Sequence, residues 1–307
     1  MAAIASEYLA DVLEPEKFAA AIFGVTLAFT VLSTNTVGLR AWIRFRKGQF
    51  GNDDYLMCTA LVVNLIHNSM VMHGAFVGIG SPDSKLNPGL DAEGRKYLFL
   101  WQIFYAINLV FIKTSILTTL KAIAKGLRYI YAIWGLIVLV SLLSIAGVIT
   151  LLAKCRPIQS NWTGSGSCID SDVFVTLSKT AYAFDVLSDL AMATISTLLL
   201  WTPQMRLRSK VLTVAALGLG VVASMASLIR TIYADAYSSD ENYLFNTGKI
   251  VLWTVVECGI GIIAGSLPML GLFRESRRIE KKWEELELQS QVDLMKAAPV
   301  QVRAGRM

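Results

Sequence analysis

The sequence predicts an all-α membrane protein, a bundle of seven transmembrane helices with its N-terminus outside the cell and its C-terminus in the cytosol. Three observations support this prediction. The 307-residue chain is 54% hydrophobic and 17% charged, with a mean hydropathy of +0.54, which is more apolar than a soluble domain of this length. Seven apolar stretches are long enough to cross a bilayer. Lys and Arg gather in alternate loops between them.

The seven apolar stretches give the predicted helices. A bilayer core about 30 Å thick requires roughly 20 apolar residues in each spanning helix. We place these helices at residues 18–39, 54–77, 98–122, 129–153, 173–201, 211–235 and 249–272. The fifth stretch is longer than a span requires, so we expect that helix to tilt or to extend beyond the bilayer.

The basic residues predict the orientation, because cytosolic loops hold the excess of Lys and Arg. Such residues cluster after the first, third, fifth and seventh helices, and the alternate segments hold roughly half as many. The clustered residues are Arg40, Arg44, Arg46, Lys47, Lys121, Lys125, Arg128, Arg206, Arg208, Lys210, Arg274, Arg277, Arg278, Lys281 and Lys282. We therefore expect a short extracellular N-terminus (1–17), a helix bundle (18–273) and a cytosolic tail (274–307).

Two segments outside the helices have a recognisable pattern. The stretch 78–96 is rich in Pro and Gly, which predicts an outer loop that forms part of a lid. In the tail, Ile279, Trp283 and Leu286 recur at helical spacing among charged residues. The tail therefore begins either as an amphipathic helix on the inner membrane surface or as a solvated charged segment. Residues 297–307 have no periodicity and are expected to be disordered.

Composition and motifs exclude several classes of protein. The net charge of +5 comes from short clusters between apolar runs, so we expect the lipid bilayer and not nucleic acid as the partner. The acidic first residues lack the basic region of a cleavable signal peptide. We find no P-loop, dinucleotide fingerprint, zinc motif or nucleophile elbow, and expect no cofactor and no metal. Retinal would need a lysine in the middle of the seventh helix, whereas Lys249 lies at its outer edge.

The loop between the fourth and fifth helices carries two modification signals. Cys155 and Cys168 lie on the predicted oxidising side and are close enough in sequence to form a disulfide, the alternative being two free thiols. Asn161 begins the sequon Asn-Trp-Thr between them and is a candidate for glycosylation, although it lies close to the membrane. Cys58 and Cys258 fall within predicted helices and are expected to be small buried apolar residues.

Ionisable residues inside the predicted helices are the main functional signal. Each costs on the order of 3 kcal/mol at the bilayer centre, so each should face the bundle interior and find a partner. The six are Lys113, Lys179, Asp185, Asp189, Arg230 and Glu257, three positive and three negative. From the helix rise, Lys113 and Asp189 lie at similar depths of roughly 22 and 24 Å, which predicts a buried pair. The alternative pairs Lys113 with Asp185.

The second predicted helix adds a polar stripe. Asn64, His67 and Asn68 fall at helical spacing and should face inward. Three interpretations stay open for these polar and charged residues: hydrogen bonds that hold the helices together, a ligand cavity, or catalysis and proton movement. The pair Asp53-Asp54 is compatible with a metal or diphosphate site, but its position at a helix start favours capping of backbone N–H groups.

Several motifs together resemble one family. These are Gly51-x-Asp53-Asp54-Tyr55, Lys113-x-Ser115, Cys155-x-Pro157, Trp162, Cys168, Asp189, Arg230, Trp253, Glu257 and Leu267-Pro268. Over roughly residues 20 to 273 the chain is similar to the fungal rhodopsin-like seven-helix membrane proteins, which include receptor-like members and members encoded in secondary-metabolite gene clusters. Two departures, Asp185 where the family usually has Asn and Ser196 where it usually has Pro, imply a more acidic site and a straighter fifth helix.

The resemblance implies a fold more directly than an activity. Our leading hypothesis is a receptor-like, non-enzymatic protein of the plasma membrane that binds a small, partly apolar ligand in an outward-facing polar cavity. One alternative is an intramembrane enzyme of a biosynthetic pathway, in which an acid among Asp185, Asp189 and Glu257 protonates an apolar substrate. A metabolite transporter is the other alternative. The ligand, a cytosolic signalling partner and the oligomeric state stay open.

Overall fold

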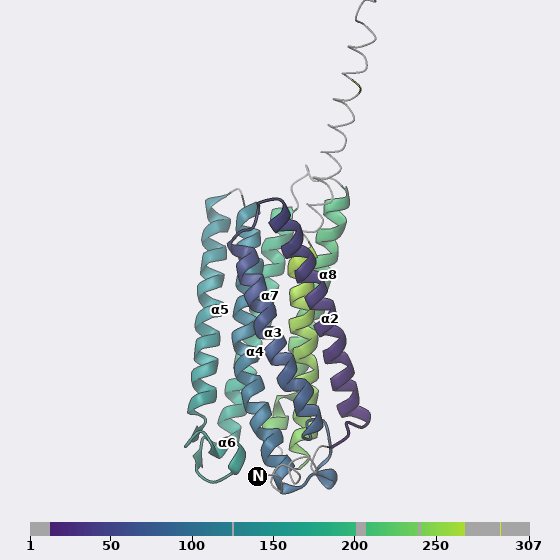
Figure 1. Ribbon diagram of the computed structural model, residues 1–307. Coiled ribbons are helices and arrows are strands. Elements are labelled where there is room, and N and C mark those ends of the chain that lie inside the picture. The colour runs from purple at the N-terminus through teal and green to yellow at the C-terminus, as the bar shows by residue number, and fades with distance from the viewer. Residues whose placement is uncertain (1–12, 125, 201–206, 239–240, 268–288, 290–307) are drawn as a thin grey trace, which may run out of the picture.

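The computed structural model is an all-α bundle of seven long apolar helices (Figure 1). It describes residues 13–124, 126–200, 207–238, 241–267 and 289. The long helices are α2 (Lys17–Arg46), α3 (Asn52–Phe76), α4 (Pro88–Ile123), α5 (Leu127–Ala153), α7 (Ser171–Leu200), α8 (Leu207–Tyr233) and a last one, Tyr243–Leu267, which we call the 243–267 helix. Each is long and apolar enough to cross a membrane, so the predicted all-α, seven-helix fold class is confirmed, and the orientation of its termini stays a prediction.

Short elements connect the long helices. They are η1 (Asp83–Lys85), β1 (Cys155–Arg156), α6 (Ser160–Thr163), β2 (Ser167–Cys168) and η2 (Ala234–Ser238). β1 and β2 pair antiparallel, with Cys155 opposite Cys168. The predicted disulfide between these two cysteines is present and confirmed. We call this end of the bundle, at the bottom of Figure 1, the disulfide end, and the other the opposite end.

The helices differ in how deeply they lie in the bundle. α4 packs extensively against α3 and α5, and both α4 and α5 contact α7 only sparsely. The most apolar window of α5 has a mean hydropathy of 2.8 and is only 6% buried, compared with 61% for the 243–267 helix. A helix that is apolar on all sides and little buried suits a position in contact with lipid. α5 therefore lies at the edge of the bundle and the 243–267 helix at its centre.

Four helix boundaries differ from the sequence prediction by four residues or more. α8 begins at Leu207 and the last helix at Tyr243, four and six residues before their predicted starts, and the other two boundaries are those of α4 and α2. The segment 88–96, predicted as part of a loop, forms the first turns of α4, because Pro88 occupies the first helical position, where its missing N–H is not needed. α2 continues to Arg46, so Arg40 and Arg44 belong to a helix and not to a loop. The remaining outer loop lies against the 243–267 helix, where Gly80 N–H donates to the Leu244 carbonyl at 3.1 Å.

Buried apolar side chains form three clusters, one among α2, α3, α4 and the 243–267 helix and the other two towards the two ends of the bundle. At the disulfide end they are Ile22, Val71, Ile79, Leu98, Trp101, Phe174, Val175, Tyr237, Leu244, Ile250, Val251 and Val255. Towards the opposite end they are Leu117, Leu120, Ile133 and Met192. We call these the disulfide-end and opposite-end apolar clusters. The polar residues discussed next lie between them.

Some predictions stay untested by the described residues. The amphipathic helix around 279–286 and the disordered stretch 297–307 lie outside them. Asn161 lies in α6, where its Nδ2 donates to the Ile158 carbonyl at 2.8 Å, and its glycosylation stays a prediction.

Candidate functional site

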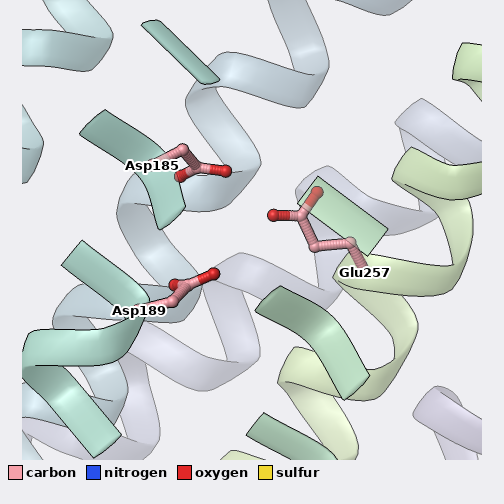
Figure 2. A group of neighbouring side chains, drawn as sticks. All are labelled: Asp185, Asp189 and Glu257. Atoms are coloured by element: carbon pink, nitrogen blue, oxygen red, sulfur yellow. The ribbon is translucent and has the colours of Figure 1, made fainter. Parts of the chain in front are cut away.

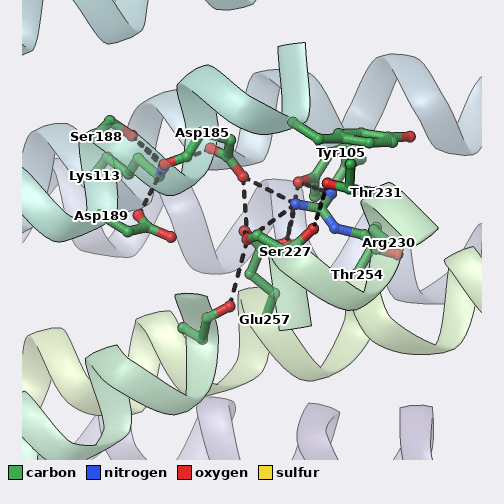
Figure 3. Close-up of polar contacts among 12 residues, drawn as sticks. Tyr105, Lys113, Asp185, Ser188, Asp189, Ser227, Arg230, Thr231, Thr254 and Glu257 are labelled. Atoms are coloured by element: carbon green, nitrogen blue, oxygen red, sulfur yellow. Dashed lines mark hydrogen bonds and ion pairs between the residues drawn. The ribbon is translucent and has the colours of Figure 1, made fainter. Parts of the chain in front are cut away.

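Five of the six charged residues predicted to lie inside the membrane meet at the centre of the bundle (Figure 3). We call them the charge cluster: Lys113 from α4, Asp185 and Asp189 from α7, Arg230 from α8 and Glu257 from the 243–267 helix. Figure 2 shows the three carboxyl groups pointing toward one another. Four helices thus contribute to one buried polar centre.

Lys113 joins both aspartates of α7. Its Nζ lies 2.5 Å from Asp185 Oδ1 and 2.7 Å from Asp189 Oδ1, and it donates to Ser188 Oγ at 2.7 Å. These three residues share one face of α7 because they lie at positions i, i+3 and i+4. The predicted Lys113–Asp189 pair is confirmed, and the alternative partner Asp185 is bound as well.

Arg230 forms ion pairs with two carboxylates on the other side of the cluster. Its Nη2 lies 2.9 Å from Asp185 Oδ2 and 2.8 Å from Glu257 Oε2. The Tyr105 hydroxyl accepts a hydrogen bond from Arg230 Nη1 and donates to Glu257 Oε2 at 3.1 Å. Ser227, one turn before Arg230 on α8, donates to Glu257 Oε1 at 2.8 Å. Arg230 is fully buried, so these bonds replace the water that its guanidinium has lost.

Lys179, the sixth predicted residue, lies outside the cluster. It is 41% exposed at the disulfide end and pairs with Asp235 of η2 at 2.6 Å. The cluster itself therefore contains three acidic and two basic side chains, in place of the balance expected from sequence. A buried charge without compensation is costly. The cluster thus favours one further positive charge, supplied by a proton or by a cationic group.

The three carboxyl groups also approach one another as metal ligands would, with oxygens within 4.8 Å. A metal ion would have to compete with Lys113 and Arg230, which already bind these oxygens. The geometry alone therefore does not make this a metal site.

The polar stripe of α3 faces inward and links helices. Asn68 Nδ2 donates to Thr30 Oγ1 of α2 at 2.8 Å, and Asn64 Oδ1 accepts from Asn108 Nδ2 of α4 at 2.9 Å. His67 is fully buried, with Nδ1 3.0 Å from Asn68 Oδ1. These contacts agree with the interpretation that the stripe holds helices together.

A cavity of about 110 Å³ lies beside the charge cluster, between α4, α5 and α7. Its lining residues are Tyr105, Ala106, Leu109, Lys113, Val140, Leu143, Ser144, Gly147, Ala181, Tyr182, Asp185 and Ser188. They lie at least six residues, about 9 Å, from the ends of their helices. The cavity therefore sits near the middle of the bundle, with Lys113, Asp185 and Ser188 as its most polar wall.

A second ionic site was missed from sequence. Arg40 is 1% exposed, and its guanidinium lies 2.7 Å from Asp53 Oδ2 and 2.8 Å from Asp54 Oδ1. It also donates to the Gly265 carbonyl at 2.8 Å, while Arg44 pairs with both aspartates. We call these residues the Arg40 site. It joins α2, α3 and the 243–267 helix at the opposite end.

The Arg40 site also decides between the two interpretations of Asp53-Asp54. Asp54 Oδ2 accepts the Gly51 N–H at 3.0 Å, so the capping expected for this pair is confirmed at Asp54. Both carboxylates are otherwise engaged by arginines. The signal for this site was present in the sequence as two acids in the first turn of a helix, a few residues after a basic helix end.

We predict that Arg40→Met lowers the free energy of unfolding by about 3–5 kcal/mol, because it leaves buried carboxylates with Arg44 alone. The matched control is Arg46→Met, which removes an exposed arginine from the same helix and should cost at most about 1 kcal/mol. Thermal unfolding of the purified variants in detergent measures both. Equal losses for the two variants would contradict the role assigned to Arg40.

We predict that Lys113→Met and Asp189→Leu each lower the free energy of unfolding by about 3–5 kcal/mol. The double variant should lose much less, because it removes both charges of the pair and leaves neither one buried alone. Coupling of Lys113 to Asp185 should be weaker, since Asp185 keeps Arg230. A double-mutant cycle of thermal unfolding gives both coupling energies. Additive losses for Lys113 and Asp189 would show that the pair contributes no stability.

Comparisons with known proteins place this architecture in a family. The model of the fungal rhodopsin domain matches residues 39–275, which include both ionic sites and the cavity. The chain is 25% identical over 248 residues to Receptor GIN3 of Arthrobotrys oligospora, which covers 79% of this chain. The chain spans only 59% of that relative's length. No solved structure matches the chain significantly. This multi-pass membrane protein belongs to the fungal rhodopsin domain family.

Proposed function

We propose that the protein is a receptor-like, non-enzymatic membrane protein that binds a small ligand in the cavity between α4, α5 and α7. The observation that carries the proposal is the position of this cavity, whose polar wall consists of members and neighbours of the charge cluster. Clefts with mostly apolar walls and a few convergent polar groups are typical of ligand sites. A relative named as a receptor supports the class.

The size of the cavity limits what it can hold. Pockets for drug-sized ligands occupy roughly 300–1,000 Å³, whereas this one has about 110 Å³. The ligand is therefore small, or only one end of it enters. The proposal keeps the small ligand expected from sequence and moves its site from an outward-facing cavity to the middle of the bundle.

The contacts around the cavity suggest how ligand binding changes the structure at the opposite end of the bundle. A ligand that bonds to Lys113 or Asp185 competes with bonds between α4, α7 and α8. Two residues beyond Lys113, Ser115 donates to the Asp53 carbonyl in the Arg40 site at 2.8 Å. A ligand that prefers one arrangement of the charge cluster thus shifts the equilibrium between arrangements of the Arg40 site. A cytosolic signalling partner would bind at that end.

The enzyme and transporter alternatives have less support. Asp185 is the only one of the three candidate acids that lines the cavity, and it accepts hydrogen bonds from Lys113 and Arg230, which suits an anion better than a proton donor. A transporter needs a path that opens alternately to both sides. The two apolar clusters above and below the cavity argue against such a path through the described residues.

Ligand binding can be tested with a panel of small amines, alcohols and carboxylic acids. A compound that binds only the folded protein raises its stability by about 2.7 kcal/mol at a hundred times its dissociation constant. We expect at least one class to raise the thermal midpoint of the native protein. Ser144→Leu, which fills the cavity, should abolish the effect, and Ala146→Leu on the exposed side of α5 should not.

Two outcomes of this screen would contradict the proposal. One is stabilisation that survives Ser144→Leu unchanged, which would place the ligand elsewhere. The other is the absence of stabilisation by all three classes in native protein that unfolds cooperatively, which would remove the cavity as a ligand site.

We also propose that the disulfide end faces the exterior and that the protein resides in the plasma membrane. A disulfide persists in oxidising compartments, which supports an exterior position for Cys155 and Cys168. Arg44, Arg46 and Lys121 lie toward the opposite end, as expected for the cytosolic side.

For this orientation, an epitope tag at the C-terminus should bind antibody only after cells are permeabilised. A second tag inserted next to Gly164, in the exposed loop of the disulfide end, should bind antibody on intact cells. Immunofluorescence of the two tagged proteins makes the comparison. The reverse pattern would overturn the orientation.

A further inference from the structure

We infer that the cavity receives the polar end of a membrane-dissolved amphiphile, which enters sideways between α5 and α7. This inference rests on the proposed ligand-binding function and adds the route and the chemical class of the ligand. It follows from which sides of the cavity are closed, what surrounds the open side, and which charges lie at the back.

Both ends of the cavity are closed by apolar side chains from the same three helices. Towards the opposite end, Leu117 of α4, Ile133 of α5 and Met192 of α7 pack together and are at most 9% exposed. Towards the disulfide end, Leu151 of α5 packs against the cluster that contains Phe174 of α7. A ligand therefore has no open path along the bundle axis through these residues.

The remaining outward side is the seam between α5 and α7. These helices contact each other sparsely, whereas each packs extensively on another neighbour. Small residues line the cavity at the seam: Ser144 and Gly147 on α5 and Ala181 on α7. Apart from the adjacent residues and the backbone of α5 itself, no heavy atom lies within 4 Å of the position that a Cβ on Gly147 would occupy, so space is open there.

The outer surfaces of the two helices that form the seam are apolar. Ile145 and Ile149 of α5 are 56% and 59% exposed, and Phe184 and Leu187 of α7 are 42% and 59% exposed. At the middle of a spanning bundle such side chains touch lipid chains and not water. A molecule that reaches the seam must already be dissolved in the bilayer, which requires an apolar body.

The polar wall at the back of the cavity determines which polar group of the ligand can bind there. Asp185 and Ser188 offer oxygen acceptors beside the Lys113 ammonium, which lines the same wall, and the charge cluster as a whole has one more acidic than basic side chain. A group that donates hydrogen bonds and carries positive charge complements this wall. The ligand class is therefore an aliphatic amine, with an alcohol as a weaker substitute and a carboxylate disfavoured.

The test uses a photoreactive octylamine with a diazirine near the amino group, added to the full-length protein in lipid vesicles. Light expels nitrogen, and the resulting carbene inserts into a neighbouring C–H or O–H bond, which marks the contact for mass spectrometry. We expect saturable labelling of peptides that contain residues 140–147 and 181–188, and competition by plain octylamine.

Two glycines of α5 provide matched variants. Gly147→Leu fills the seam and should reduce this labelling about tenfold. Gly135→Leu also has no atom within 4 Å of the added Cβ, but Gly135 lies outside the cavity and its replacement should leave the labelling unchanged. Both changes remove a helix glycine, so their effects on helix stability match.

A short, water-soluble butylamine with the same diazirine tests the entry route separately from the ligand-binding function, because it can reach the cavity without dissolving in the bilayer. Labelling of the cavity by this probe but not by the octylamine, or octylamine labelling that is insensitive to Gly147→Leu, overturns the sideways route and leaves the ligand site standing. Cavity peptides labelled by neither probe would overturn the amine class, whereas the thermal screen with alcohols and carboxylic acids decides separately whether the cavity is a ligand site.

Discussion

The structure depends on the neutralisation of buried charge. Lys113 and Arg230 lie where neither lipid nor water can solvate them, so each must be met by carboxylates from other helices. The ion pairs of Lys113 connect α4 to α7, and those of Arg230 connect α8 to α7 and to the 243–267 helix. Because apolar side chains gain nothing by leaving lipid for one another, such polar contacts and close packing fix which helices are neighbours.

The Arg40 site is a second buried ionic site that connects helices nearer the opposite end of the bundle. Arg40 ties α2 to α3 and to the 243–267 helix near the opposite end. Six of the seven long helices therefore take part in one buried ionic site or both. No described side chain of α5 forms an ion pair with either site, and α5 is held by apolar packing on α4. This difference explains why a cavity and an open seam lie beside α5.

Much of this architecture could be predicted from the sequence. Hydropathy located the seven spans, and the shared loop located the disulfide. The requirement that intramembrane charges find partners identified Lys113 and Asp189 as a pair. Lys179 was expected to face the bundle interior like the other intramembrane charges, whereas it is 41% exposed at the disulfide end and pairs with Asp235. Arg40 was assigned to a loop because hydropathy falls before α2 ends.

Other features leave little trace in a single sequence. Tyr105, Ser188 and Ser227 are common residue types in membrane helices, and only the crossing of four helices shows that they complete the charge cluster. The cavity depends on small residues of α5, a helix whose composition indicates only contact with lipid. The completion of the charge cluster and the cavity thus depend on packing between helices, which hydropathy does not predict.

Hydrogen exchange of backbone amides, followed by mass spectrometry in the Arg230→Met variant, tests most directly whether the charge cluster unites four helices. If it does, exchange should rise together and most strongly in the middle of α4, α7, α8 and the 243–267 helix, and least in the segments around Arg40 in α2 and α3. Faster exchange confined to α8, or spread evenly over all helices, would contradict the account.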